Sequence, residues 1–180
     1  LSMSIQMLEM AAPAIIQLQK LTRMWSATYQ LIAGEMESQP EEVVLWDILK
    51  KPVHLMVPVL DKKHITFIHT GNFDQKYFLD KEILALSFFA ILMLGLTVGS
   101  SESQIQLVGT NENSKTTLSF SIPTESTVEG LDQWLQKDFT KVEDLPDVLN
   151  HGVLKPMSYG IIFLNVSSKT SFWDLKWANS

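Results

Sequence analysis

The sequence contains no cysteine, and this absence excludes several structural devices at once. Without thiols the chain forms no disulfide and offers no thiolate to a zinc ion, and its composition fits a reducing compartment. An excess of positive charge is also missing, because 14 lysines and arginines face 20 aspartates and glutamates, for a net charge of −6. Nucleic-acid-binding surfaces normally show a basic face, so we expect no nucleic-acid partner.

Motifs of common enzyme sites are absent as well. The chain has no G-x-x-x-x-G-K-[ST], no G-x-G-x-x-G and no G-x-S-x-G. Its four histidines are scattered, and His64 and His69 stand at an odd separation on one predicted strand, so they point to opposite faces. Metal ligands must converge on one point. We therefore expect no metal site, and the residues alone give no basis for assigning an enzymatic activity.

The sequence does contain one long apolar stretch, ILALSFFAILMLGLTVG at Ile83–Gly99. Asp80, Lys81 and Glu82 precede it, and acids near a helix N-terminus are favoured by the helix dipole. A stretch that is apolar all round fits a helix buried on several sides. A membrane span is the alternative, but it needs roughly 20 apolar residues. We predict a buried core helix.

Residues 1–37 show helical periodicity, with apolar residues recurring every three or four positions. Because proline is disfavoured inside a helix, Pro13 predicts that one helix ends at Met10 and another begins near Ala12. Such a hairpin cannot bury both of its faces alone. We expect it to form a four-helix bundle with a second copy, and packing on the rest of the chain is the alternative. The apolar stripe consists of Ile15, Leu18, Leu21 or Thr22, Trp25, Tyr29 and Ile32.

The remaining chain predicts an alternation of helices and strands. Ser38 and Pro40 are typical of a helix start, so we expect a helix through Leu49 that Pro52 bends or restarts. The fold class is therefore α+β, with a helical hairpin at 1–38 and a sandwich at 39–180. Strands are predicted at His64–His69, Ser103–Gly109, Lys115–Ile122, Gly160–Val166 and Ser171–Trp177, a loop before the core helix at Gly71–Asp74, a helix at Thr127–Asp138 and a hairpin loop at Ser167–Thr170.

The order of these elements resembles the core of a histidine kinase, in which a dimerising helical hairpin precedes an ATP-binding, GHKL-like α/β sandwich. In that family one helix has the pattern D-x-x-x-L-x-x-x-L-x-N-L-x-x-N-A. Asp80, Leu84 and Phe88 stand at its aspartate and its first two apolar positions. Its two asparagines fall on Ala90 and Leu94, and the second of these asparagines is the family's magnesium–phosphate ligand.

Two further nucleotide-binding features of that family are missing. After its equivalent of the strand Lys115–Ile122 the family has D-x-G-x-G, whereas this chain has Pro123–Thr127. The glycine-rich lid expected before Gly160 is absent too. The chain thus lacks a metal ligand, an adenine-binding aspartate and a glycine backbone that could surround phosphates. The resemblance therefore implies a degenerate sandwich, and we expect no ATP and no other cofactor.

A helical hairpin joined to such a sandwich is similar to the ChpT-type histidine phosphotransferases. These proteins relay phosphoryl groups between receiver domains of a two-component phosphorelay. The likeness covers Leu1–Met10, Ala12–Glu37 and Glu41–Trp177. The family's phosphate-accepting histidine lies about three helical turns before the position of Leu1, so we expect it upstream and assign no residue here as catalytic.

The resemblance implies a cytoplasmic homodimer without a membrane span that passes phosphoryl groups between receiver domains and does not bind ATP. The alternative is a non-catalytic protein that binds or inhibits a kinase or a response regulator. In the family, receivers dock along the hairpin below the histidine. Methionine suits adaptable interfaces, although a methionine stripe at helical spacing also fits a bundle core. The implied partner-binding residues are Met3, Met7, Ile16, Gln19, Lys20 and Arg23.

Overall fold

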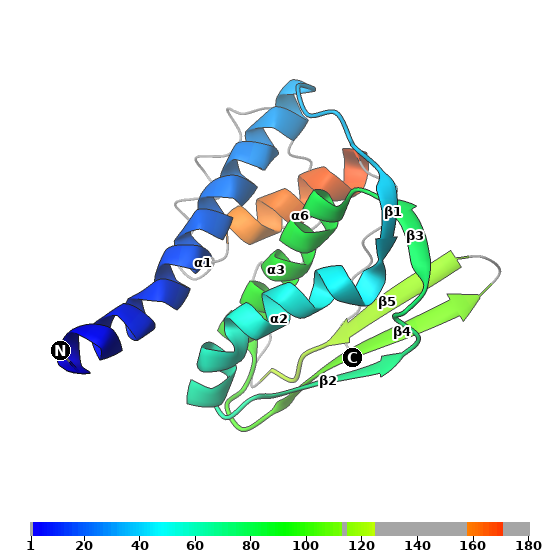
Figure 1. Cartoon of the computed structure of the whole chain (residues 1–180). Coiled ribbons are helices and arrows are strands. Elements are labelled where there is room, and N and C mark those ends of the chain that lie inside the picture. Colours follow the sequence, from blue (N-terminus) through cyan, green and yellow to red (C-terminus); the bar gives the residue numbers. More distant parts are fainter. Residues whose placement is uncertain (1, 113–114, 125–157, 171–180) are drawn as a thin grey trace.

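Helices packed against one face of a small sheet make up the part of the chain that the computed structural model describes, residues 2–112, 115–124 and 158–170 (Figure 1). The α+β class predicted from the sequence is confirmed. The predicted helix at Thr127–Asp138 and the predicted strand at Ser171–Trp177 lie outside the described residues. The helices are α1 (Ser2–Ala33), α2 (Leu45–Lys62), α3 (Lys81–Val98) and α6 (Ser158–Thr170), and the strands are β1 (Glu41–Val44), β2 (Thr66–Gly71), β3 (Lys76–Leu79), β4 (Gln104–Glu112) and β5 (Lys115–Ser121).

The strands form two sheets. β2 runs parallel to β4, with Phe67 opposite Ile105, and β4 pairs antiparallel with β5. Parallel neighbours need a crossover connection, and α3 lies on the segment that connects these two strands. β1 and β3 pair antiparallel in a separate two-stranded sheet. The strands predicted at His64–His69, Ser103–Gly109 and Lys115–Ile122 are confirmed as β2, β4 and β5, with ends shifted by a few residues.

Helix α3 is the buried core helix that the apolar stretch predicts. Asp80 caps its start, because the Oδ1 atom accepts hydrogen bonds from the backbone amides of Glu82 and Ile83 at 2.9 and 3.0 Å. These bonds satisfy amides that have no partner inside the helix. Among the described helices, α3 alone is long and apolar enough to cross a membrane, and 56% of its residues are buried inside the fold.

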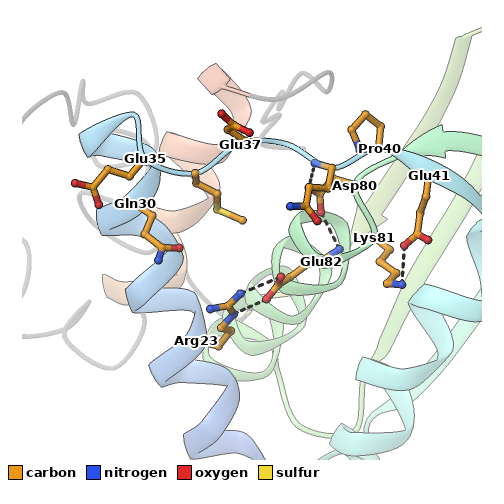
Figure 2. A pocket seen from close by; sticks show the side chains of 11 residues that line it. Arg23, Gln30, Glu35, Glu37, Pro40, Glu41, Asp80, Lys81 and Glu82 are labelled. Atoms are coloured by element: carbon orange, nitrogen blue, oxygen red, sulfur yellow. Dashed lines mark hydrogen bonds and ion pairs between the residues drawn. The ribbon is translucent and has the colours of Figure 1, made fainter.

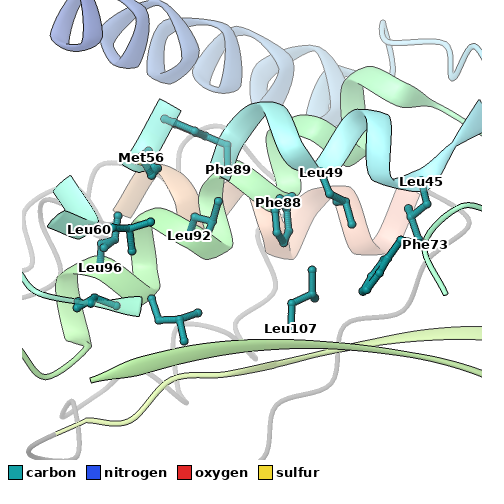
Figure 3. Close-up of a cluster of buried hydrophobic side chains, with 12 residues drawn as sticks. Leu45, Leu49, Met56, Leu60, Phe73, Phe88, Phe89, Leu92, Leu96 and Leu107 are labelled. Carbon is teal, nitrogen blue, oxygen red and sulfur yellow. The ribbon is translucent and has the colours of Figure 1, made fainter. Parts of the chain in front are cut away.

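Two hydrophobic clusters pack against α3. The first lies between α3, α2 and the β2–β4–β5 sheet (Figure 3), and its least exposed members are Leu49, Met56, Phe89, Leu92 and Ile105. The second lies between α3, α1 and α6, and it includes Met24, Ala27, Leu86, Ile162 and Phe163. Residues of α3 belong to both clusters, so α3 is the element that the two cores share. Full burial of one such large side chain stabilises a fold by about 1.5–3 kcal/mol.

The predicted helical hairpin is wrong, because α1 is one continuous helix from Ser2 to Ala33. Pro13 removes one backbone hydrogen bond, but the alanines on either side of it are the strongest helix formers and carry the helix through. Pro52 and Pro58 likewise lie inside an uninterrupted α2, so the helix does not restart at Pro52. The domain boundary at residues 38 and 39 stays a prediction.

The segment after α1 also differs from its prediction. Glu41–Val44 is strand β1, where the sequence predicted a helix beginning at Ser38. Proline followed by two acids imitates a helix start, but the β-branched pair Val43 and Val44 favours a strand, and pairing with β3 supplies the hydrogen bonds. The predicted connection at Gly71–Asp74 does not lead straight to α3, since β3 lies between them.

The predicted strand at Gly160–Val166 and the predicted hairpin loop at Ser167–Thr170 are both wrong, because these residues belong to helix α6. A short apolar run cannot be assigned to strand or helix by periodicity, and its isoleucines, phenylalanine and valine favoured a strand. Every residue from Ile161 to Ser167 is buried. A helix can present apolar side chains all round when other helices cover it, as α1 and α3 do here.

Candidate functional site

The predicted partner-binding residues all lie on α1. The sequence prediction placed them on the two helices of a hairpin. Because α1 is a single helix, they are instead spread along one helix. Four of them recur at intervals of three or four residues and share one face. The helical register places positions 3 and 7 on roughly the opposite side, and their side chains lie outside the described residues. The four residues that share a face are Ile16, Gln19, Lys20 and Arg23, which we call the docking face.

The docking face is open to solvent in its N-terminal part and tied to α3 in its C-terminal part. Ile16 is 42% exposed, Gln19 is exposed and Lys20 is half-buried. Arg23 forms a two-point ion pair with Glu82 in the first turn of α3: Nε bonds to Oε1, and Nη2 donates to Oε2 at 3.1 Å. Two parallel bonds of this kind fix the angle of the guanidinium as well as its position. The pair therefore links α1 to the start of the core helix.

This ion pair changes the titration of both partners. The hydrogen bond from Arg23 lowers the pKa of the Glu82 carboxyl, and partial burial of the carboxyl opposes this lowering. The same bond raises the pKa of Arg23. Both side chains are about half exposed, at 50% and 42%, so solvent screens the attraction and the pair contributes about 0–1 kcal/mol. The sequence predicted Arg23 as a surface residue, whereas Glu82 was seen only as a helix-start acid.

A polar hollow of about 580 Å³ lies beside Arg23, between the C-terminal end of α1, the start of β1 and the start of α3 (Figure 2). Its two basic side chains are both bonded to carboxylates, since Lys81 pairs with Glu41 at 2.6 Å and Arg23 pairs with Glu82. The lining residues that carry charge are Arg23, Glu35, Glu37, Glu41, Asp80, Lys81 and Glu82.

Hydrogen bonds to Asp80, which lines the hollow, hold the surrounding elements together. Asp80 Oδ2 accepts a hydrogen bond from the backbone amide of Gln39 at 2.9 Å, while Oδ1 caps α3. One carboxylate thus fastens the connection after α1 to the start of α3. No group of three or more histidine, aspartate or glutamate side chains among the described residues is arranged to hold a metal ion. The arrangement is that of a structural junction in which both cations are paired with carboxylates and acidic side chains are in excess.

The positions of the two kinase asparagines lie inside the core. Ala90 is 1% exposed and Leu94 is 3% exposed, and neither side chain carries a hydrogen-bonding group. Helix α6 approaches Ala90 so closely that a Cβ atom added to Gly160 would lie 3.5 Å from the Ala90 Cβ. Asp80, at the pattern's aspartate position, caps α3 instead of facing a cavity in the core. This face of α3 is apolar and packed.

Comparisons with known proteins place this fold. No protein-family model matches the sequence, and no curated protein matches it. Among solved structures, the chain is similar to the nucleotide-free catalytic domain of the histidine kinase ThkA, with a TM-score of 0.53 and 17% sequence identity. The match covers 75% of this chain and 80% of that one. At this identity the likeness establishes the fold alone: the chain has the fold of a histidine kinase catalytic domain.

Proposed function

We propose that this chain acts in two-component signalling without ATP, by binding receiver domains of response regulators through the docking face of α1. One observation carries the proposal: a histidine kinase catalytic fold that has buried Ala90 and Leu94 where the kinase pattern has asparagines. The methyl group of Ala90 and the isobutyl group of Leu94 bind neither a metal ion nor phosphate. We therefore expect the protein to act on other proteins by binding them through its surface.

The composition of the docking face supports an acidic partner. Ile16 offers an exposed apolar contact, and Lys20 and Arg23 add two cations beside it. The phosphorylation site of a receiver is acidic, so complementary charge would orient it along this face of α1 and raise the association rate. Arg23 is half exposed even while paired with Glu82, which leaves it within reach of a partner.

Phosphoryl relay is the more specific form of this function. A histidine nitrogen would attack the phosphorus of a receiver's aspartyl phosphate, so that an N–P bond forms, the O–P bond breaks and the aspartate leaves as a carboxylate. Residues 2–33 contain no histidine, so relay requires a histidine elsewhere in the protein. The alternative form is a non-catalytic protein that binds or inhibits a kinase or response regulator.

Binding to a panel of purified receiver domains from the same organism tests the docking face. We expect Ile16→Asp to weaken the affinity for the cognate receiver at least tenfold, because it removes an apolar contact and adds a repelled charge. Thr117→Asp, at a position on β5 that is also exposed, is the control and should leave the affinity unchanged. If no receiver binds at all, the proposal is overturned.

Receivers charged with radiolabelled acetyl phosphate separate the two forms of the function when the assay uses the full-length protein, with any residues that precede Leu1. Acid-labile, base-stable label on this chain indicates a phosphohistidine and supports relay. Binding without any transfer of label supports the non-catalytic form. Calorimetry with Mg-ATP tests nucleotide binding separately, and we expect no saturable heat. Saturable binding of Mg-ATP would contradict the proposal that the protein acts without ATP.

A further inference from the structure

One cation of the docking face already has an anionic partner inside the chain. Arg23 holds the Glu82 carboxylate by two bonds, from Nε to Oε1 and from Nη2 to Oε2, and both side chains are about half exposed. An acidic side chain of a receiver would present the same chemical group to the same two donors. The Nε–Nη2 edge of a guanidinium holds one carboxylate in this way, so Glu82 and an acidic partner compete for Arg23.

Glu82 lies beside the docking face, in the first turn of α3. Figure 2 shows its carboxylate directed from α3 toward Arg23 on α1. The hydrogen bond from Arg23 is the main cause of the lowered pKa of Glu82, and the charge of Lys20 adds to this lowering. One carboxylate of the same chain therefore acts on both cations of the docking face.

We propose that Glu82 is an internal competitor that lowers the affinity of the docking face for acidic partners. This inference rests on the proposed function, because the partners are receiver domains at the same face. When a receiver docks, the two bonds from Arg23 to Glu82 break and two bonds to an acidic group of the receiver form. Arg23 is free in only a fraction of the chains, and the apparent affinity is reduced by that fraction.

The fold permits this exchange of partners. An ion pair at this exposure is weak, so it opens in an appreciable fraction of the chains. The start of α3 keeps another attachment when Arg23 leaves Glu82, because Asp80 still accepts the hydrogen bond from the Gln39 amide. The rest of α3 is held by the two hydrophobic clusters. Arg23 can therefore change partners without detaching α3 from the fold.

Competition of this kind also affects which partners bind. A surface whose acidic group cannot meet both donors of Arg23 does not offset the loss of the two bonds to Glu82. A well-placed acidic group does offset it, and the two kinds of partner then differ in affinity. Glu82 is thus a specificity-determining residue, although it lies on α3 and outside the docking face itself.

Glu82→Gln is the direct test, with the affinity for the cognate receiver measured by calorimetry. Glutamine keeps the size of the side chain and removes the charge that holds Arg23. We expect the dissociation constant to fall about two- to fivefold. The control is Glu42→Gln, which makes the same change in net charge at an exposed carboxylate of β1 that pairs with Lys76. The control should leave the dissociation constant unchanged.

An Arg23→Gln background shows whether Glu82 acts through Arg23. Arg23→Gln alone should weaken binding, and adding Glu82→Gln to it should give little of the gain seen in the native chain, because no guanidinium is left to release. An equal gain in both backgrounds means that Glu82 acts only by repelling the partner, and this contradicts the competition. Both positions are about half exposed, so circular dichroism should show native helix content in every variant.

The two proposals fail in different ways. If the native chain binds a receiver and Glu82→Gln binds it no better, the internal competition is overturned and the docking face stands. If neither the native chain nor Glu82→Gln binds any receiver, the proposed function is overturned and the competition with it. Binding by Glu82→Gln where the native chain shows none supports both proposals, since it means that Glu82 keeps the docking face occupied.

Discussion

Helices α3 and α1 are both rich in apolar residues, yet the fold treats them differently. α3 is apolar all round, and α2, the sheet, α1 and α6 cover it. α1 has two apolar faces, of which one packs on α3 and α6 while the other stays exposed at Ile15 and Leu18. A helix without a polar face must be covered by its own chain. A helix with a second apolar stripe can remain folded while it offers that stripe to a partner.

The sharpest test of this contrast removes one large side chain from each helix. Phe89 of α3 is fully buried, and we expect Phe89→Ala to lower the free energy of unfolding by about 3–5 kcal/mol through lost burial and a cavity. Leu18→Ala in α1 should change the stability of the monomer by less than about 0.5 kcal/mol. Urea denaturation followed by circular dichroism, at low protein concentration, measures both. Equal losses in the two variants would abolish the distinction between the helices.

The second prediction applies the same comparison within α1. Met24 is fully buried on the face that packs on the core, so Met24→Ala should cost about 2–5 kcal/mol. Ile15→Ala, on the exposed face of α1, is the matched change and should cost less than about 0.5 kcal/mol. Thermal unfolding of both variants provides the measurement. A large loss for Ile15→Ala would mean that this face already has a partner within the chain.

A smaller effect is expected where α3 begins. Asp80→Ala removes the cap of α3 and the hydrogen bond to the Gln39 amide, and we expect a loss of about 0.5–2 kcal/mol. Asp80→Asn keeps an acceptor oxygen and should retain most of the stability, because asparagine is an equally good cap. Denaturation midpoints of the two variants distinguish the cap from the charge. If Asn were as damaging as Ala, the negative charge would be the important property.

The smallest effect concerns the ion pair that joins the two helices. The pKa of Glu82 is lowered in the folded state, so its stabilising contribution is present above the ordinary glutamate pKa, about 4.3, and is lost as pH falls through the folded value. Glu82→Gln should therefore reduce stability by less than about 1 kcal/mol at neutral pH and approach the native protein in acid. Salt should narrow the neutral-pH difference. A difference that grows on acidification would contradict the assignment.

The sequence predicted the elements whose patterns fit one kind of secondary structure. The long run in α3 is helical whether it is a core helix or a membrane span, and the alternation in β4 and β5 has no helical equivalent. The acids at Asp80 and Glu82 predicted a helix start through the helix dipole, and α3 begins at Lys81 with Asp80 as its cap. For the candidate site, the resemblance to the kinase helix pattern identified Ala90 and Leu94, and their positions along one helix are preserved whatever the tertiary structure. Ile16 and Arg23 were placed on α1, but the hairpin that was to join them to Met3 and Met7 is not formed.

Other features depended on neighbours far along the chain. β1 is a strand because β3 pairs with it, although Pro40 and the acids after it resemble a helix start. α6 is a helix because α1 and α3 cover it on several sides, although its residue types favour a strand. The partner of Arg23 is 59 residues away, so no local pattern could have identified Glu82.

By itself, then, the sequence determined that α3 is the core helix, that β2, β4 and β5 are strands, and that the asparagine positions of the kinase pattern are apolar. These conclusions rest on periodicity and spacing, which are local properties. Only the tertiary structure decided which face of α1 is buried, because two apolar stripes compete and packing chooses between them. Burial of Met24 against α6 left Ile15 and Leu18 exposed.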